Sequence, residues 1–326
     1  MPDVRSQMVY GPLQTVSIAY RNTSYVADRV FPIMDGVDPK CKILKYKKGA
    51  WFRDEAGIRA PGTRSKRGTF PVSSESLSTA EYSFASPVTK EDRRLAKSQN
   101  APPLKPDQDA IEYAADRIDL KKERRVAAAV TGTTWVDGAS GGEDAEGLWS
   151  PAGSTNTFLA DVKKAIKAIK TATGLKANAM LIDYATYMAL KECAEILDKI
   201  KYTQRGVLTR DLLAAILELE DVIIGEAVYS TADEAADGDD FTARNIWEVN
   251  AGKGMGFVFY RPRKLGLKVV TAGMQYRLRQ DNGKPRWVET WYEAPEKQDV
   301  YDVGEESDIT EICADAGYLF KDTYST

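Results

Sequence analysis

Two short glycine-rich segments of this 326-residue chain have the form of catalytic motifs. Residues 138–142 read Gly-Ala-Ser-Gly-Gly, which fits the Gly-x-Ser-x-Gly pattern around the nucleophilic serine of many esterases. Residues 251–256 are similar to a phosphate-binding loop, but the spacing differs and neither serine nor threonine follows the lysine. The chain contains no histidine, so a serine or cysteine nucleophile cannot be activated by an imidazole, and histidine metal sites are excluded. We therefore interpret residues 138–142 as a flexible loop and residues 251–256 as a turn between two strands.

The remaining reactive side chains are solvated or scattered. Five acids lie in one alanine-rich segment: Asp233, Glu234, Asp237, Asp239 and Asp240. With few apolar neighbours, their carboxyl pKa values are not raised, and we interpret the segment as a solvated loop. Three distant cysteines, Cys41, Cys193 and Cys313, have neither metal-site spacing nor the density of a disulfide framework. We predict no catalytic residues, no cofactor and no metal, with a lysine- or carboxylate-based enzyme as a minor alternative.

The most unusual stretch of the chain is basic and poor in apolar residues. Residues 40–72 carry ten Lys/Arg against only Asp54 and Glu55. Residues 1–131 carry 23 Lys/Arg and 16 Asp/Glu, a balance of +7, so residues 132–326 carry −10 of the total of −3. This division suits a molecule whose basic front docks on the acidic back of another copy, and a solvated surface of uneven charge explains it equally well.

A long helix and a mixed α/β segment would position these parts. Residues 107–131 have apolar side chains at helical spacing, with Pro106 before them and Gly132 after them, so we predict a helix that lies across a sheet. We interpret its Lys-Lys-Glu-Arg-Arg run as a solvated face rather than a nucleic-acid site. Residues 155–265 mix helix and strand patterns, including one helix over 184–200. Strands dominate after residue 265 and are expected to return beside the long helix.

Several strands can be placed from the sequence. Residues 41–52 and 75–86 are predicted to pair as the two strands of a hairpin with a tip between them. This hairpin has too few apolar residues to form its own core, so we expect it to lie against another surface. We also predict a strand pair from 244–250 and 255–261, and one more short strand region over 311–322. The longest apolar runs fall short of the ~20 residues of a membrane span.

The order arm, hairpin, long helix, α/β segment and returning strands resembles the major capsid proteins of tailed bacteriophages, the Hong Kong ninety-seven type. Three local stretches of sequence are also similar to this family. Residues 178–192 (NAMLIDYATYMALKE) resemble its strand followed by a helix. Residues 208–250 resemble its run of a helix, a Val-rich strand, a loop and an Ile-Trp strand, and residues 312–322 resemble its terminal Ala-Gly-Tyr segment.

The resemblance implies an α+β fold with five parts. They are an N-terminal arm (1–40), an extended β-hairpin loop (41–86), a first part of the peripheral domain (87–154) with the spine helix (107–131), an inserted axial α/β domain (155–265), and a peripheral return with C-terminal strands (266–326). The loop would lie on neighbouring subunits. The contact residues expected on it are Lys47, Lys48, Trp51, Arg53, Arg59, Arg64, Lys66, Arg67 and Phe70.

The function implied by the resemblance is structural. The chain would assemble with itself into hexamers and pentamers of an icosahedral shell around phage double-stranded DNA, which it would meet through non-specific proximity. A separate scaffolding protein, a portal and a decoration protein are further expected partners, no membrane is involved, and the virion shell would form in the bacterial host cytoplasm. An encapsulin-like nanocompartment shell is the main alternative.

Overall fold

The computed structural model describes residues 21–22, 24–97, 104–146, 148–149, 156–200, 208–233, 241–266, 268–278 and 284–324. Most of the expected arm and four of the five clustered acids lie outside these ranges. Within them, no helix is both long and apolar enough to cross a membrane.

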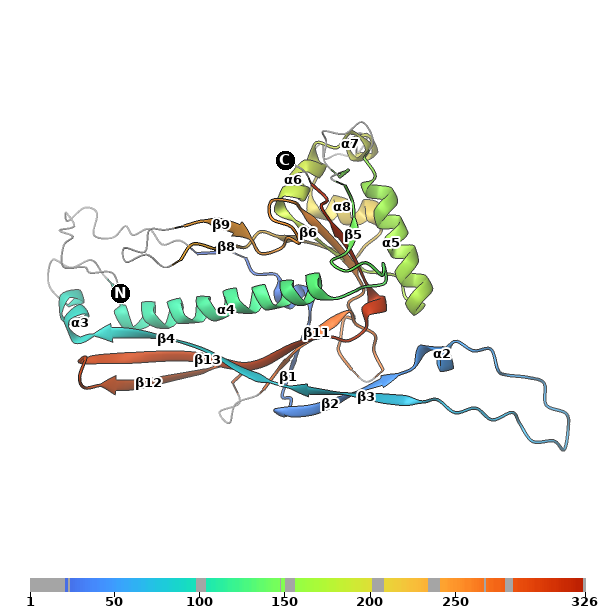
Figure 1. Cartoon of the computed structure of the whole chain (residues 1–326), viewed down its shortest axis with the longest axis horizontal. Coiled ribbons are helices and arrows are strands. Elements are labelled where there is room, and N and C mark those ends of the chain that lie inside the picture. The colour runs from blue at the N-terminus through green and yellow to red at the C-terminus, as the bar shows by residue number, and fades with distance from the viewer. Residues whose placement is uncertain are drawn as a thin grey trace.

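A five-stranded sheet and the long helix α4 (Pro106–Gly132) form the elongated half of the molecule. The strands are β1 (Ile33–Asp35), β4 (Ala80–Thr89), β11 (Gly273–Arg277), β12 (Trp287–Glu293) and β13 (Gln298–Glu311). The central strand β13 pairs antiparallel with β12, β11 and β4. Helix α4 lies along one face of β4 and β13, with Ala114 and Ile118 against Val303 (Figure 1). On the opposite face, the base of the β2–β3 ribbon packs on Met274 and Tyr276 of β11. The helix predicted over 107–131 and the return of late strands beside it are both confirmed.

A second five-stranded sheet lies at one end of α4 and is covered on both faces. Its order is β5 (Glu143–Asp144), β14 (Gly317–Lys321), β10 (Met255–Phe259), β6 (Ala179–Asp183) and β7 (Asp221–Gly225). Helices α5 (Phe158–Thr173), α6 (Tyr184–Lys191), α7 (Ala194–Ile200) and α8 (Arg210–Leu217) pack on one face. The last turns of α4 and the short helix α1 (Ala27–Val30) pack on the other. Helix α4 therefore joins the two halves, because its earlier turns pack on the main sheet and its last turns pack on the second sheet.

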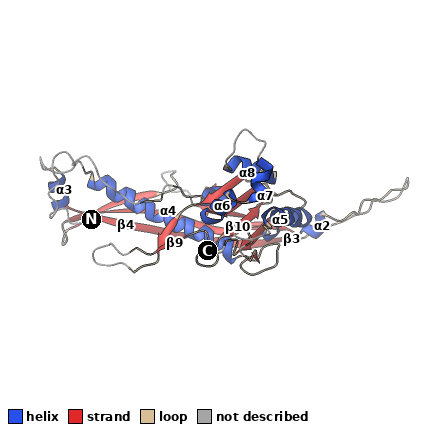
Figure 2. Cartoon of the chain, turned by 90° about the horizontal axis from the view of Figure 1, so that it is seen from above, coloured by secondary structure: helices blue, strands red, loops and turns tan. Residues whose placement is uncertain are grey.

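The remaining elements are short. They are β2 (Lys40–Tyr46), α2 (Lys48–Trp51), β3 (Val72–Ser78), α3 (Lys90–Ala96), β8 (Val228–Ser230), β9 (Ala243–Asn245) and the 3₁₀ turn η3 (Ala314–Ala316). Strands β2 and β3 pair with each other, and the chain between them projects far beyond the body (Figures 1 and 2).

Four local predictions are wrong. The first hairpin strand ends at Tyr46 rather than at residue 52, because α2 follows it. The second is interrupted at Thr79, and residues 80–86 pair with β13 in the main sheet. The helix predicted over 184–200 breaks between α6 and α7. The pair expected from 244–250 and 255–261 does not form, because β9 pairs with β8 and β10 with β6 and β14.

The C-terminal segment also differs from the expectation of a peripheral strand. Strand β14 lies inside the second sheet, between β5 and β10. Its side chains Tyr318, Leu319 and Phe320 are all buried, on both faces, and such a strand is stable only where both faces of its sheet are covered. The second sheet, with helices on both faces, offers that environment.

The charged run of α4 is not a solvated face. Glu123 has no exposed surface, and its carboxylate accepts hydrogen bonds from the backbone N–H groups of Val26 and Ala27, the second at 2.7 Å. It also accepts one from the Trp247 indole N–H at 2.6 Å. Burial raises the pKa of Glu123, and these three donors act in the opposite direction. One carboxylate thus joins α4 to the start of α1 and to the second half of the molecule.

We predict that Glu123→Gln destabilises the protein by about 2 kcal/mol, because the amide presents a donor where three N–H groups need an acceptor. Glu112→Gln, an exposed change of the same chemistry on the same helix, should change the free energy of unfolding by less than about 0.5 kcal/mol. Urea denaturation of the unassembled protein measures both. Equal stability of the two variants would mean that the buried carboxylate does not hold these segments together.

Candidate inter-subunit contact surface

The projecting loop begins with a two-stranded ribbon that is anchored only at its base. Strands β2 and β3 pair from Lys40 with Ser78 to Tyr46 with Val72. Leu77 is their one buried side chain, and it packs with Met274 and Tyr276 of β11. The ribbon therefore has a firm attachment to the main sheet at one end and no core of its own beyond it.

All nine predicted contact residues lie on the exposed part of the loop. They are Lys47, Lys48, Trp51, Arg53, Arg59, Arg64, Lys66, Arg67 and Phe70. The structure brings two of them together: the rings of Trp51 and Phe70 lie 6.0 Å apart, and Tyr46 lies 6.1 Å from each. The ammonium group of Lys268 lies over the Tyr46 ring at 5.4 Å. The other predicted residues are spread along the loop and do not converge.

Helix α2 is held on the body by two contacts that the sequence analysis missed. The Lys48 ammonium group lies 2.5 Å from the Asp315 carboxylate. Phe52 packs against Gly174, where an added Cβ would lie 3.3 Å from the ring. The only sequence signal for the second contact was Phe52 itself, an aromatic residue next to Trp51 in an otherwise basic stretch. Beyond Phe52 the loop is free of the body, so α2 sets the direction in which it leaves.

The tip, residues 53–71, is exposed throughout and carries unbalanced positive charge. Its acids are Asp54 and Glu55, and Glu55 lies 3.8 Å from Arg53. No ion pair within the described ranges involves Arg59, Arg64, Lys66 or Arg67. Ile58 is fully exposed. The tip is therefore the most exposed and most basic segment of the loop.

The two segments with the form of catalytic motifs are structural. Gly138, Gly141 and Gly142 all have positive φ, and they form the loop that leads into β5. Residues 251–256 form a turn that enters β10, and its Lys253 pairs with Asp322 at 3.3 Å. The loop at 138–142 and the turn at 251–256 expected from the sequence are both present.

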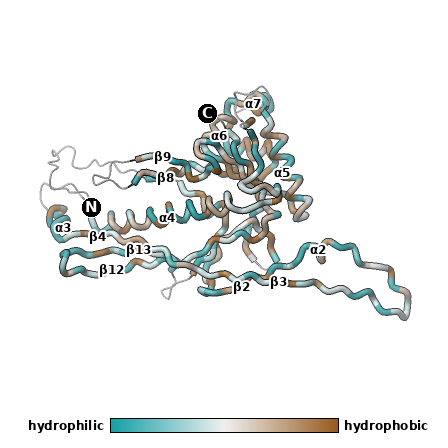
Figure 3. Tube along the Cα trace, viewed as in Figure 1, coloured by the Kyte–Doolittle hydropathy of each residue, from teal (hydrophilic) through white to brown (hydrophobic). Residues whose placement is uncertain are grey.

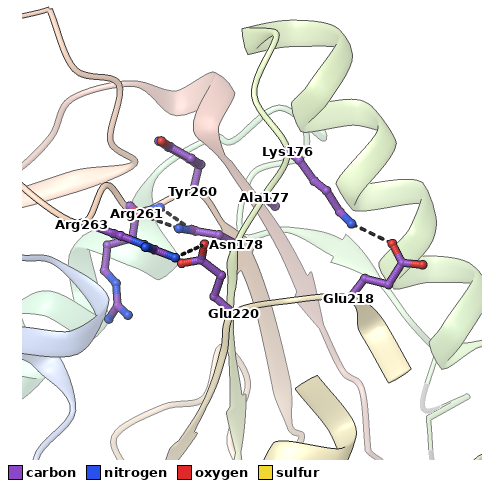
Figure 4. A pocket seen from close by; sticks show the side chains of 8 residues that line it. All are labelled: Lys176, Ala177, Asn178, Glu218, Glu220, Tyr260, Arg261 and Arg263. Atoms are coloured by element: carbon purple, nitrogen blue, oxygen red, sulfur yellow. Dashed lines mark hydrogen bonds and ion pairs between the residues drawn. The ribbon is translucent and has the colours of Figure 1, made fainter. Parts of the chain in front are cut away.

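A shallow pocket between the second sheet and its connections shows no catalytic arrangement (Figure 4). Lys176 pairs with Glu218 at 2.8 Å and Arg263 with Glu220 at 3.0 Å, each at the surface. The Asn178 side chain bonds the backbone of Arg261 through both its oxygen and its nitrogen. These groups therefore bond to one another across the pocket.

The buried carboxylate of Asp183 is bonded to backbone N–H groups that it holds in place. It caps α6 through the Thr186 N–H at 3.1 Å and accepts the Met255 N–H at 2.9 Å. Burial raises the pKa of Asp183. Across the described residues, no three Cys, Asp or Glu side chains are grouped to hold a metal ion. The surface that stands out is therefore the projecting loop and not a pocket.

Comparison with known proteins gives a relative in sequence and several relatives in structure. No protein-family model matches the chain. It is 29% identical over 242 residues to the major capsid protein of Burkholderia phage BcepMu, and the match covers 73% of each chain. It is similar in structure to a phage-related protein from Bordetella bronchiseptica RB50, with a TM-score of 0.68 and 20% identity over 94% of both chains. It is also similar to the capsid of cyanophage P-SCSP1u, with a TM-score of 0.59 and 13% identity over 98% of this chain and 93% of the other.

These similarities span nearly the whole chain, so they cover the projecting loop, the long helix and both sheets together. The α+β fold expected from the sequence is confirmed. The chain therefore has the Hong Kong ninety-seven type fold of the tailed-phage major capsid proteins, and it resembles one of them in sequence along about three quarters of its length.

Proposed function

We propose that this chain is the structural subunit of a phage shell, which assembles with itself into hexamers and pentamers and encloses double-stranded DNA. The observation that carries the proposal is the loop between Tyr46 and Val72, which projects from the body with exposed aromatic and basic side chains and no core. Its packing partner is another copy of the chain, so the loop overlaps neighbouring subunits. The sequence relative, itself a major capsid protein, supports the same reading.

Many weak contacts are enough for such a shell. Each subunit meets several neighbours, and multivalency converts modest single contacts into a stable assembly. The nine loop residues named above supply part of these contacts. A scaffolding protein, a portal and a decoration protein are further partners, and the shell forms in the host cytoplasm. A nanocompartment shell is the alternative, and it is not favoured because the relative matched in sequence is a phage protein.

Replacing residues 54–69 with a short Gly/Ser linker should separate folding from assembly. The change leaves β2, β3, α2 and both sheets in place and removes only exposed residues, so the free energy of unfolding of the isolated subunit should change by less than about 1 kcal/mol. Closed shells should no longer form in negative-stain microscopy. Normal shells from this variant would show that the loop does not join subunits, and an unfolded product would show that it belongs to the core.

Reversing the charge of the tip should impair assembly without unfolding the subunit. In Arg64→Glu/Lys66→Glu/Arg67→Glu, three exposed cations become anions, which turns attraction to a neighbour into repulsion. The charge-preserving control Arg64→Lys/Arg67→Lys should assemble. Light scattering follows assembly and circular dichroism follows the fold. Normal assembly of the triple variant at low salt would exclude a role for tip charge.

A further inference from the structure

Helix α5 presents a straight row of lysines to solvent. One face of this helix packs in the core of the second half, and Figure 3 shows hydrophobic and hydrophilic residues alternating along it. Lys163, Lys167 and Lys170 are all exposed on the other side. With 3.6 residues per turn, these three positions fall within about 60° of one another around the helix axis. We call these three residues the lysine row.

The lysine row is not neutralised within the subunit. Among the described residues, no ion pair involves any of its three members. The neighbouring Lys164 and Lys176 differ from them, because they pair with Glu143 at 2.5 Å and with Glu218 at 2.8 Å. Glu218 also lies within electrostatic range of Lys163, but its bond is with Lys176. The row therefore keeps most of its positive charge.

The charges of the row oppose one another. Lys163 and Lys167 are four residues apart, and Lys167 and Lys170 are three apart, which are spacings at which like charges destabilise a helix. A helix face that serves only solubility usually interleaves acids with its lysines. The single acid of α5, Asp161, instead accepts a hydrogen bond from the Trp149 indole N–H at 2.8 Å. An anionic partner outside the subunit would relieve the repulsion within the row.

The row is an exception within its own part of the chain. Residues 132–326 have a balance of −10, whereas α5 has four lysines and one acid, a balance of +3. This part of the chain as a whole repels polyanions, and the exposed side of α5 attracts them. Figure 1 shows α5 at the outer border of the second half, where a long ligand can lie along it.

The composition of this surface favours a phosphate backbone over another protein. Cores of protein interfaces are depleted in lysine and enriched in aromatic residues and arginine, and α5 exposes no aromatic residue and no arginine. Lysine ammonium groups are hydrated point charges that bind phosphates without a fixed geometry. From Lys163 to Lys170 the row extends about 10 Å, a length over which one strand of a duplex presents about three phosphates.

On the basis of the proposed shell function, which supplies double-stranded DNA as the enclosed ligand, we propose that the lysine row binds the phosphate backbone of that DNA. The contact is independent of base sequence, because contacts with phosphates position a duplex without reading its bases. Few contacts per subunit make each one weak and salt-sensitive, and many subunits hold the same DNA together. The row then faces the enclosed space of the shell.

The first test compares two variants of the full-length chain that each lose three exposed positive charges. The row variant is K163Q/K167Q/K170Q, and the tip variant, its matched control, is R64Q/K66Q/R67Q. Fluorescence anisotropy measures the binding of unassembled subunits to a labelled DNA duplex of mixed sequence. The row variant should bind about ten-fold more weakly than the unmodified chain, and the tip variant within about two-fold of it. Equal losses in the two variants would show that only net charge matters and would overturn the proposal.

The salt dependence of the same binding counts the phosphate contacts. The logarithm of the binding constant falls with the logarithm of the salt concentration by about 0.9 for each phosphate contact on a duplex. Loss of three contacts should therefore reduce this slope by about 2.7 in the row variant, and the tip variant should keep the slope of the unmodified chain. A row variant with an unchanged slope would mean that the row does not contact phosphates.

The second test locates the contact on the protein. An N-hydroxysuccinimide ester acetylates exposed lysines, and mass spectrometry measures the rate at each one. Bound duplex should suppress the acetylation of Lys163, Lys167 and Lys170. It should not suppress that of Lys199, which is exposed on α7 beside Asp198. Equal protection of Lys199 would mean that the DNA coats the surface without preference, which would overturn the proposal.

The outcomes separate this inference from the shell function. The row variant should still form closed shells, because none of its three residues lies in the projecting loop. Closed shells together with undiminished duplex binding would overturn only the lysine row as a DNA site. Loss of shells with undiminished duplex binding would also overturn it and assign the row to a contact between copies. Unmodified chain that stays monomeric at high concentration would overturn the shell function, whatever the row does.

Discussion

The architecture depends on a single buried carboxylate. Glu123 lies two thirds of the way along α4, has no exposed surface, and is bonded by two backbone N–H groups before α1 and in its first turn and by the Trp247 indole. A buried carboxylate is costly unless its lone pairs are filled, and removing one partner leaves the others unsatisfied. Satisfying it therefore requires that the N-terminal segment, the long helix and the connection after β9 reach their places together. The two halves of the molecule are fixed relative to each other by that requirement.

With the body held in this way, the projecting loop needs no core of its own. Its described residues from 53 to 71 are all exposed, while the base of its ribbon is anchored by Leu77 on Met274 and Tyr276 of β11. In the shell that we propose, the loop gains its packing partners from neighbouring copies and not from its own subunit.

The sequence predicted the elements that carry a strong local signal. Helix α4 has a proline before it and a regular apolar period, and α5 ends at Gly174 with positive φ, so both could be placed within a few residues. The loop residues that we propose for inter-subunit contacts could be named because a basic stretch without apolar period stands out. Asp315 and Gly174, which contact Lys48 and Phe52, could not be predicted. Contacts between segments that are distant in the sequence produce no pattern in the spacing of residues along the chain.

The longest strand was missed for a physical reason. Strand β13 contains six acids among fourteen residues, and acids are depleted in strands, so local propensity argues against it. Its stability comes from neighbours on both edges and from arginines that neutralise one face. Glu123 was misread for a related reason: a charge within a basic helical run signals solvent in most proteins, and only the tertiary structure shows which member of the run is buried.

The position of β14 has a consequence for the timing of folding. This strand, residues 317–321, fills the gap between β5 and β10, and β10 would otherwise present one open edge within the core. Its partners β5 and β10 are synthesised before it, so the second sheet cannot close until the chain has reached residue 321, and such long-range pairing is slow. Until then β5, which pairs with β14 alone, has no place in the sheet, and one edge of β10 stays open. The closing of this sheet is therefore tied to a late step of synthesis, after α4 and the helices of the second half have already been made.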